Sequence, residues 1–137
     1  MAKSSTGGRR GLQVALGCVA VIPLLSGLTG MARGPAGLPG ATGAVDATLD
    51  SEYRFVNAFW LAAAPVVWSS LPRVEERGPL LRAALGTAFV GGLGRLASLS
   101  TAGRPHPAML GALAIELVGV PALLAWQARV ASAAKRR

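Results

Sequence analysis

Four long apolar blocks dominate this sequence and leave little else for the chain to fold with. They cover about residues 11–31, 51–71, 80–100 and 108–128. A helix of about twenty residues, rising about 1.5 Å per residue, crosses the roughly 30 Å hydrocarbon core of a bilayer. The blocks therefore predict an all-α membrane protein, a bundle of four transmembrane helices joined by short connections.

The composition agrees with this prediction. Of the 137 residues, 52% are hydrophobic and 15% are charged, whereas a soluble domain carries about 25% charged residues. Because four crossings use most of the chain, no room is left for a soluble catalytic domain. Any function must lie within the helix bundle or at its two rims.

The formal net charge of +8 could indicate nucleic-acid binding, but the distribution of the charge favours membrane topology. Basic residues gather on one side of the predicted bundle and are sparse on the other. The basic side holds Lys3, Arg9, Arg10, Arg73, Arg77, Arg82, Arg129, Lys135, Arg136 and Arg137, and the loops of the opposite side hold Arg33 and Arg104. By the positive-inside rule, both termini should be cytoplasmic in a plasma-membrane protein, and nucleic acid is not an expected partner.

The polar segments divide the rest of the chain. Residues 1–10 are basic and rich in Gly and Ser, so we expect a disordered cytoplasmic arm. Residues 11–129 form the four-helix domain, and residues 130–137 form a basic cytoplasmic tail. Residues 32–49, rich in Gly and Pro, are expected to be a flexible external loop.

Local signals refine the first two spans. Pro23 should kink the first helix, because proline cannot donate to the helical hydrogen-bond ladder. Asp46 or Asp50 should cap the second helix. A basic start followed by an apolar run also fits a secretory signal, whose removal would leave three helices. The run is longer than a signal core and residues 30–32 make a poor cleavage site, so we expect the first helix to be retained.

Small residues recur every four positions in the third and fourth blocks. They are Ala84, Ala88 and Gly92 in one block and Ala108 and Ala112 in the other. Such stripes let two backbones approach closely inside a membrane, where no hydrophobic effect draws helices together. The two blocks are therefore expected to pack as an antiparallel hairpin.

Two ionisable residues of these blocks, Arg95 and Glu116, are expected to lie clearly inside the hydrocarbon core, away from the ends of the spans. Each would cost about 3 kcal/mol to bury alone in the hydrocarbon, so such residues are usually paired or line a cavity. Their depths match, and the small-residue faces carry them toward each other. We expect Arg95 to hold Glu116 by a bidentate hydrogen bond.

Further polar residues should lie at the outer mouth of the bundle, where Arg54 or Arg104 is expected to pair with Glu52. Together with Arg95 and Glu116 they form the candidate buried polar network or ligand site. Its members are Asp50, Glu52, Arg54, Asn57, Arg95, Arg104 and Glu116. A network that locks the helices in register is favoured over a ligand site.

Other catalytic or metal-binding candidates are weak. His106 is the only histidine and Cys18 the only cysteine, so neither a metal site nor a thiolate–imidazole pair is expected. No phosphate-binding glycine motif or dinucleotide fingerprint is present. We therefore predict no catalytic residue, no metal and no cofactor.

The order of several short motifs along the chain indicates a protein family. Residues 50–55 open a helix as DSEYRF, Gly94 and Arg95 follow late in the next block but one, residues 103–105 form a GRP turn, and Glu116 comes after them. Over about residues 11–129 this order resembles a group of small bacterial membrane proteins catalogued as domain of unknown function DUF4345. The resemblance implies a four-helix membrane domain and no particular activity, substrate or cofactor.

Three functions remain open. The first is a non-enzymatic helper or ligand-binding membrane subunit. Its expected partners are the lipid bilayer and either a second copy of the chain or another membrane protein. The second is a small proton-coupled carrier or transporter subunit in which Glu116 carries the proton. The third is a lipid-modifying membrane enzyme with Glu52 or Glu116 as acid or base.

Overall fold

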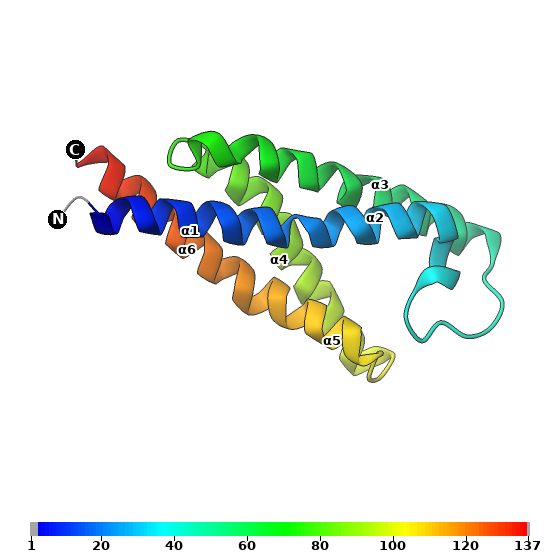
Figure 1. Cartoon of the computed structure of the whole chain (residues 1–137). Helices are drawn as coiled ribbons and strands as arrows, with labels where there is room; N and C mark the ends of the chain where they lie inside the picture. Colours follow the sequence, from blue (N-terminus) through cyan, green and yellow to red (C-terminus); the bar gives the residue numbers. More distant parts are fainter. Residues whose placement is uncertain (1–2, 137) are drawn as a thin grey trace.

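The computed structural model describes residues 3–136, which fold into helices joined by short turns (Figure 1). The α-helices are α1 (Lys3–Val19), α2 (Val21–Arg33), α3 (Ala47–Ser70), α4 (Gly78–Thr101), α5 (Pro107–Ala114) and α6 (Val120–Lys135). Two 3-10 segments, η1 (Gly34–Gly37) and η2 (Leu71–Arg73), and one π-helical segment, η3 (Ile115–Gly119), extend or connect them.

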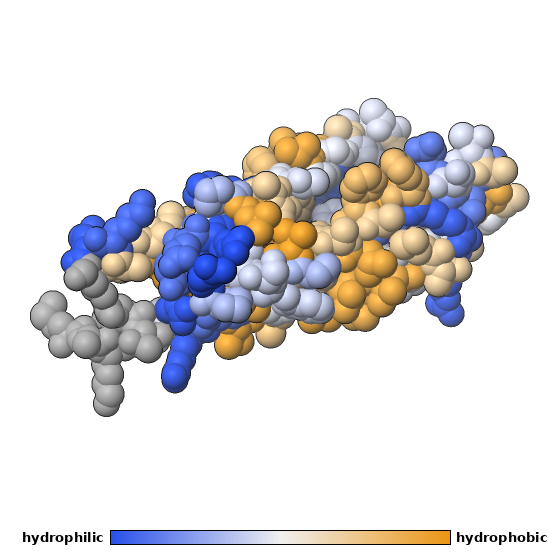
Figure 2. Space-filling model, turned by 90° about the horizontal axis from the view of Figure 1, so that it is seen from above, coloured by the Kyte–Doolittle hydropathy of each residue, from blue (hydrophilic) through white to orange (hydrophobic). Residues whose placement is uncertain are grey.

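These elements form four rods, each long and apolar enough to cross a membrane. The rods are Gly7–Gly37, Ala47–Arg73, Gly78–Thr101 and Pro107–Lys135. Figure 2 shows apolar surface gathered in the middle of the molecule and hydrophilic surface at both ends. The prediction of an all-helical chain with four such helices is confirmed.

Two prolines explain why two of the rods are interrupted. A proline has no backbone N–H, so the carbonyl four residues before it loses its helical donor. For Pro23 that carbonyl belongs to Val19, where α1 ends, and the expected kink is a single-residue break at Ala20. For Pro121 it belongs to Leu117, inside η3, whose wider turn is closed by a hydrogen bond from the Val120 N–H to the Ile115 carbonyl.

Glycines set how closely the helices approach one another. A Cβ added at Gly27 would lie 2.6 Å from the backbone nitrogen of Leu61, so α2 and α3 are in backbone contact. A Cβ at Gly92 would lie 2.9 Å from the Cβ of Glu116, which puts α4 directly against η3. The expected antiparallel hairpin of the third and fourth rods is therefore confirmed, and Gly92 is one point of close contact within it.

The bundle is tightly packed at one end and open at the other. The start of α1, the end of α6 and the 71–77 turn lie at the closed end, where the buried core centres on Leu12, Leu16, Val74 and Leu81 (Figure 1). Toward the other end, which we call the open end, the α2–α3 pair diverges from the α4–α5 pair. There α5 contacts neither α2 nor α3.

The helices are longer than the predicted spans. The expected disordered arm is helical from Lys3 onward, and the expected tail is helical as far as Lys135, while residues 1–2 and 137 lie outside the described residues. The first turns of α1 gain contacts from Arg9, whose guanidinium bonds to the 71–77 turn. A segment with such partners no longer behaves as an isolated polar arm.

The expected loop at residues 32–49 is also shorter than predicted. Helix α2 reaches Arg33, η1 follows it, and α3 begins at Ala47. Asp46 is the N-cap of α3, since its Oδ1 accepts a hydrogen bond of 2.9 Å from the Leu49 N–H. Of the two candidate caps, the structure therefore selects Asp46.

Candidate functional site: a cavity between two helix pairs

A cavity of about 620 Å³ lies between the α2–α3 pair and the α4–α5 pair, from the middle of the bundle to its open end. Its walls are mainly apolar side chains. They include Ile22 from α2, Val56 from α3, Leu85 from α4, Leu113 from α5 and Val120 from α6. Its charged lining residues are Arg95 and Glu116, and its other polar ones include Ser26, Tyr53, Asn57 and Ser98.

The connection between α2 and α3 reaches across the mouth of this cavity. Leu38 from that loop and Pro105 from the α4–α5 turn both line it. Gly40 has a φ of +78°, and a Cβ added there would lie 3.3 Å from the Cβ of His106. Glycine is favoured at this position because the loop turns with a positive φ where it meets the other hairpin.

Arg95 and Glu116 meet on the cavity wall, as the sequence predicts. The Arg95 Nε donates a 3.1 Å hydrogen bond to Oε1 of Glu116 and lies 3.0 Å from Oε2. The Glu116 side chain is only 9% exposed, whereas that of Arg95 is 39% exposed. The predicted pairing of Arg95 with Glu116 is therefore confirmed. Of the small-residue stripes, Gly92 lies in close contact at this pair, whereas Ala84, Ala88, Ala108 and Ala112 line the cavity.

The predicted bidentate geometry is wrong. A single nitrogen, Nε, faces both carboxylate oxygens and donates to Oε1, and Nη1 instead faces the sulfur of Met109 at 3.6 Å. The close approach at Gly92 explains the difference, because it places the Cβ of Glu116 directly against α4. The carboxylate then faces the side of the guanidinium rather than its tip.

The other predicted network residues separate into distinct groups. Arg54 binds Asp50 through two nitrogens, at 2.7 Å and 3.2 Å, and also donates to the Met31 carbonyl at the end of α2. Arg54 therefore pairs with Asp50 one turn away rather than with Glu52. Glu52 and Arg104 are exposed and do not line the cavity.

Asn57 is buried and lines the cavity from α3. Its Nδ2 donates a 2.7 Å hydrogen bond to the Tyr53 carbonyl in its own helix. A Cβ added at Gly30 would lie 2.2 Å from the Asn57 Cγ, so the amide fills the space that this glycine leaves. Its observed contacts thus serve the α2–α3 packing.

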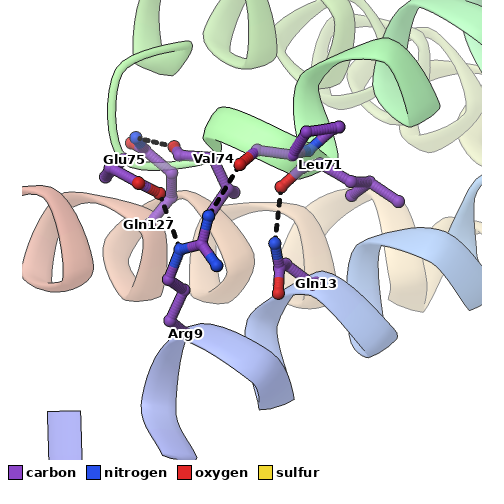
Figure 3. Close-up of polar contacts among 7 residues, drawn as sticks. Arg9, Gln13, Leu71, Val74, Glu75 and Gln127 are labelled. Carbon is purple, nitrogen blue, oxygen red and sulfur yellow. Dashed lines mark hydrogen bonds and ion pairs between the residues drawn. The ribbon is translucent and has the colours of Figure 1, made fainter. Parts of the chain in front are cut away.

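A polar cluster at the closed end was not predicted, and Figure 3 shows it. Side chains from α1 and α6 there donate to backbone carbonyls of η2 and of the turn that follows it. Arg9 bonds to Glu75 at 3.0 Å and to the Pro72 carbonyl at 2.6 Å, Gln13 bonds to the Leu71 carbonyl at 2.7 Å, and Gln127 bonds to the Val74 carbonyl at 2.9 Å. Two glutamines inside apolar blocks were the available signal.

The Arg9–Glu75 contact predicts a pH dependence of stability. Partial burial acts to raise the pKa of Glu75, but the hydrogen bond from Arg9, a backbone hydrogen bond and the charge of Arg9 outweigh it, so the pKa lies below its ordinary value. A lowered folded-state pKa means that the stabilisation is complete above the ordinary glutamate pKa. It is lost as the pH falls from that value through the folded-state pKa.

Thermal unfolding of the detergent-solubilised protein between pH 7 and pH 3 measures this effect. The melting temperature of Glu75→Gln should depend less on pH than that of the unaltered chain. Glu76→Gln is the matched control, because Glu75 rather than Glu76 pairs with Arg9. Equal acid sensitivity of the unaltered chain and Glu75→Gln would contradict the assignment.

Comparison with known proteins identifies one family. In residues 3–136, no three His, Cys, Asp or Glu side chains come together in a way that could hold a metal ion. No curated protein and no solved structure gives a significant match. The family model described as Domain of unknown function (DUF4345) matches residues 11–127. This range includes the greater part of each of the four rods. The chain therefore belongs to this family, as its motif order indicated.

Proposed function

We propose that the chain is a non-enzymatic, multi-pass plasma-membrane protein with both termini in the cytoplasm, and that it binds an amphipathic ligand in the cavity between its two helix pairs. The observation that carries this proposal is the Arg95–Glu116 ion pair on the wall of an otherwise mainly apolar cavity of about 620 Å³. Ligand pockets commonly measure about 300–1,000 Å³ and combine apolar walls with a few polar groups.

The outer surface of the bundle supports the membrane part of the proposal. Large apolar side chains are exposed along the rods, among them Leu25, Phe55, Phe59, Val90 and Val118. Exposure of so many large apolar side chains is unfavourable in water and favourable in lipid. The basic residues gathered at the closed end support a cytoplasmic location for that end.

Reporter fusions test this topology. Alkaline phosphatase fused after residue 137 should be inactive, and the same reporter inserted at residue 43 should be active, because only the second would be exported. Green fluorescent protein at the C-terminus should fluoresce. An active phosphatase at the C-terminus would refute the proposed orientation.

Filling the cavity tests ligand binding. Ala112 lines the cavity from α5, whereas Ala114, in the same helix, is exposed and does not line it. Ala112→Trp should reduce the binding of a fluorescent single-chain lipid to the protein in nanodiscs by about tenfold, since the indole would occupy the ligand's volume. Ala114→Trp should bind as the unaltered chain does. Equal binding by both variants would exclude the cavity as the site.

A proton-coupled carrier is the second candidate. It is favoured by the buried Oε2 of Glu116, which accepts no hydrogen bond from the described residues, and by the position of Glu116 in a π-helical segment, a feature frequent at functional sites. Proteoliposomes that carry no proton current under a pH gradient would remove this candidate.

A further inference from the structure

The Arg95 side chain has hydrogen-bonding capacity that the described residues do not use. A guanidinium has five N–H donors, and Nε serves Glu116. Among residues 3–136, the acceptor near Nη1 is the sulfur of Met109, a weak one, at 3.6 Å. Because Arg95 lines the cavity and is 39% exposed, its terminal nitrogens are available to an acceptor inside the cavity.

The net charge of the site limits which acceptor can enter. Among the described residues that line the cavity, the charged ones are Arg95 and Glu116, and their charges cancel. An anion would therefore add an uncompensated charge in a region of low dielectric constant, and so would a cation. The negative charge of the Glu116 carboxylate also repels an anion directly. The site favours a headgroup that accepts hydrogen bonds but carries no net charge.

The dimensions of the cavity limit the apolar part of the ligand. A water molecule, which is close in size to a methylene group, takes about 30 Å³ in the liquid. At about 620 Å³, the cavity thus holds roughly twenty such groups, enough for one long chain with a small headgroup but not for a two-chain lipid. Leu85 and Leu99 of α4 both line it, so it extends roughly 20 Å along the helix.

The charged pair lies near one end of this length. Arg95 is one helical turn from Leu99, close to the open end, whereas Leu85, Val67 and Val120 line the deeper part. A polar group at the mouth and an apolar channel beyond it match the two parts of a single-chain amphiphile.

We infer that the cavity binds a single-chain lipid with an uncharged, hydroxyl-bearing headgroup, of the monoacylglycerol kind. The headgroup oxygens accept hydrogen bonds from the terminal nitrogens of Arg95, and the chain lies toward Leu85 and Val120. This inference rests on the proposed function and names the ligand class of the same site.

Three probes that share one brominated C18 chain test it, with a glycerol, a sulfate or a trimethylammonium headgroup. Bromine quenches tryptophan fluorescence, and Trp60 lines the cavity. The probes are titrated into the full-length protein in nanodiscs, where specific binding is saturable and its quenching is lost in Trp60→Phe. The glycerol probe should bind at least tenfold more tightly than either charged probe.

Two variants should change this ranking in a predictable direction. Glu116→Gln leaves Arg95 uncompensated, so the affinity for the sulfate probe relative to the glycerol probe should rise at least tenfold. Adding Arg95→Gln to that variant should reverse the change. Ser98→Lys adds a positive charge at an exposed position of the lining without altering the pair, and it should shift the ranking in the same direction even if Glu116→Gln folds poorly.

The outcomes separate the two proposals. If none of the three probes shows saturable, Trp60-dependent quenching in the unaltered protein, the cavity binds no single-chain amphiphile, and the proposed function fails together with the inference. If the three probes bind equally, the headgroup assignment is overturned while binding in the cavity stands. The same conclusion follows if Glu116→Gln and Ser98→Lys leave the ranking of the probes unchanged, provided that melting curves show both variants to be folded.

Discussion

Gly27→Ala should destabilise the protein by about 2 kcal/mol or more, within or above the usual range for overpacking. The added Cβ would lie 2.6 Å from the nitrogen and 2.8 Å from the Cα of Leu61. These are backbone atoms of α3, so no side-chain rotation can relieve the clash. The helices α2 and α3 must move apart, and with them the wall of the cavity to which both contribute.

Thermal or denaturant unfolding in detergent measures this effect, and Gly86→Ala is the matched control. A Cβ at Gly86 in α4 meets nothing within 4 Å. Alanine is favoured over glycine within a helix by about 0.5–1 kcal/mol, so this variant should be neutral or slightly more stable. If the two variants unfold alike, the close packing of α2 on α3 is not what the structure describes.

Arg95→Leu should cost about 3 kcal/mol, near the lower end of the usual loss when one partner of a buried ion pair is removed, because Glu116 is buried and Arg95 is partly exposed. The variant leaves Glu116 with 9% of its side chain exposed and without the cation that lies 3.0 Å from its carboxylate. An isolated carboxylate in this position is far more costly than the pair. The expected result is a large fall in melting temperature and in the yield of folded protein.

The double variant Arg95→Leu, Glu116→Leu separates the cost of an unpaired charge from the value of the pair. Replacing both partners by apolar residues is often neutral or stabilising, so the double variant should recover most of the stability lost in Arg95→Leu. A double variant as unstable as the single one would show that the damage comes from repacking rather than from charge.

The same double variant bears on function. If it folds well and no longer binds the glycerol probe, the Arg95–Glu116 pair serves a ligand site. If it folds well and binds the probe as the unaltered chain does, the pair acts as a structural link between α4 and η3. The contribution of the Arg95–Glu116 pair to stability and its contribution to ligand binding are thus measured on one variant.

Local periodicity was enough to predict much of the fold. The apolar blocks predicted the four rods, Asp46 was one of two predicted caps, and the matched depths of Arg95 and Glu116 predicted their contact. These features depend on residues a few positions apart in one helix, and helix geometry converts such spacings directly into shared faces.

Partner choice depended on tertiary structure. Arg54 pairs with Asp50 rather than Glu52, and α1 extends to Lys3 with Arg9 bound to Glu75. Each of these contacts depends on how two helix ends lie in space, and charge and spacing alone allow several partners.

By itself, the sequence determined that the chain forms four apolar helices and that one cation and one anion share an interface between two of them. Only the tertiary structure decided that these charges line a cavity and that Gln13 and Gln127 help close the opposite end. The physical reason is that a cavity is the volume left between elements. It depends on the angle at which the helix pairs diverge, and that angle follows from contacts between residues far apart in the chain.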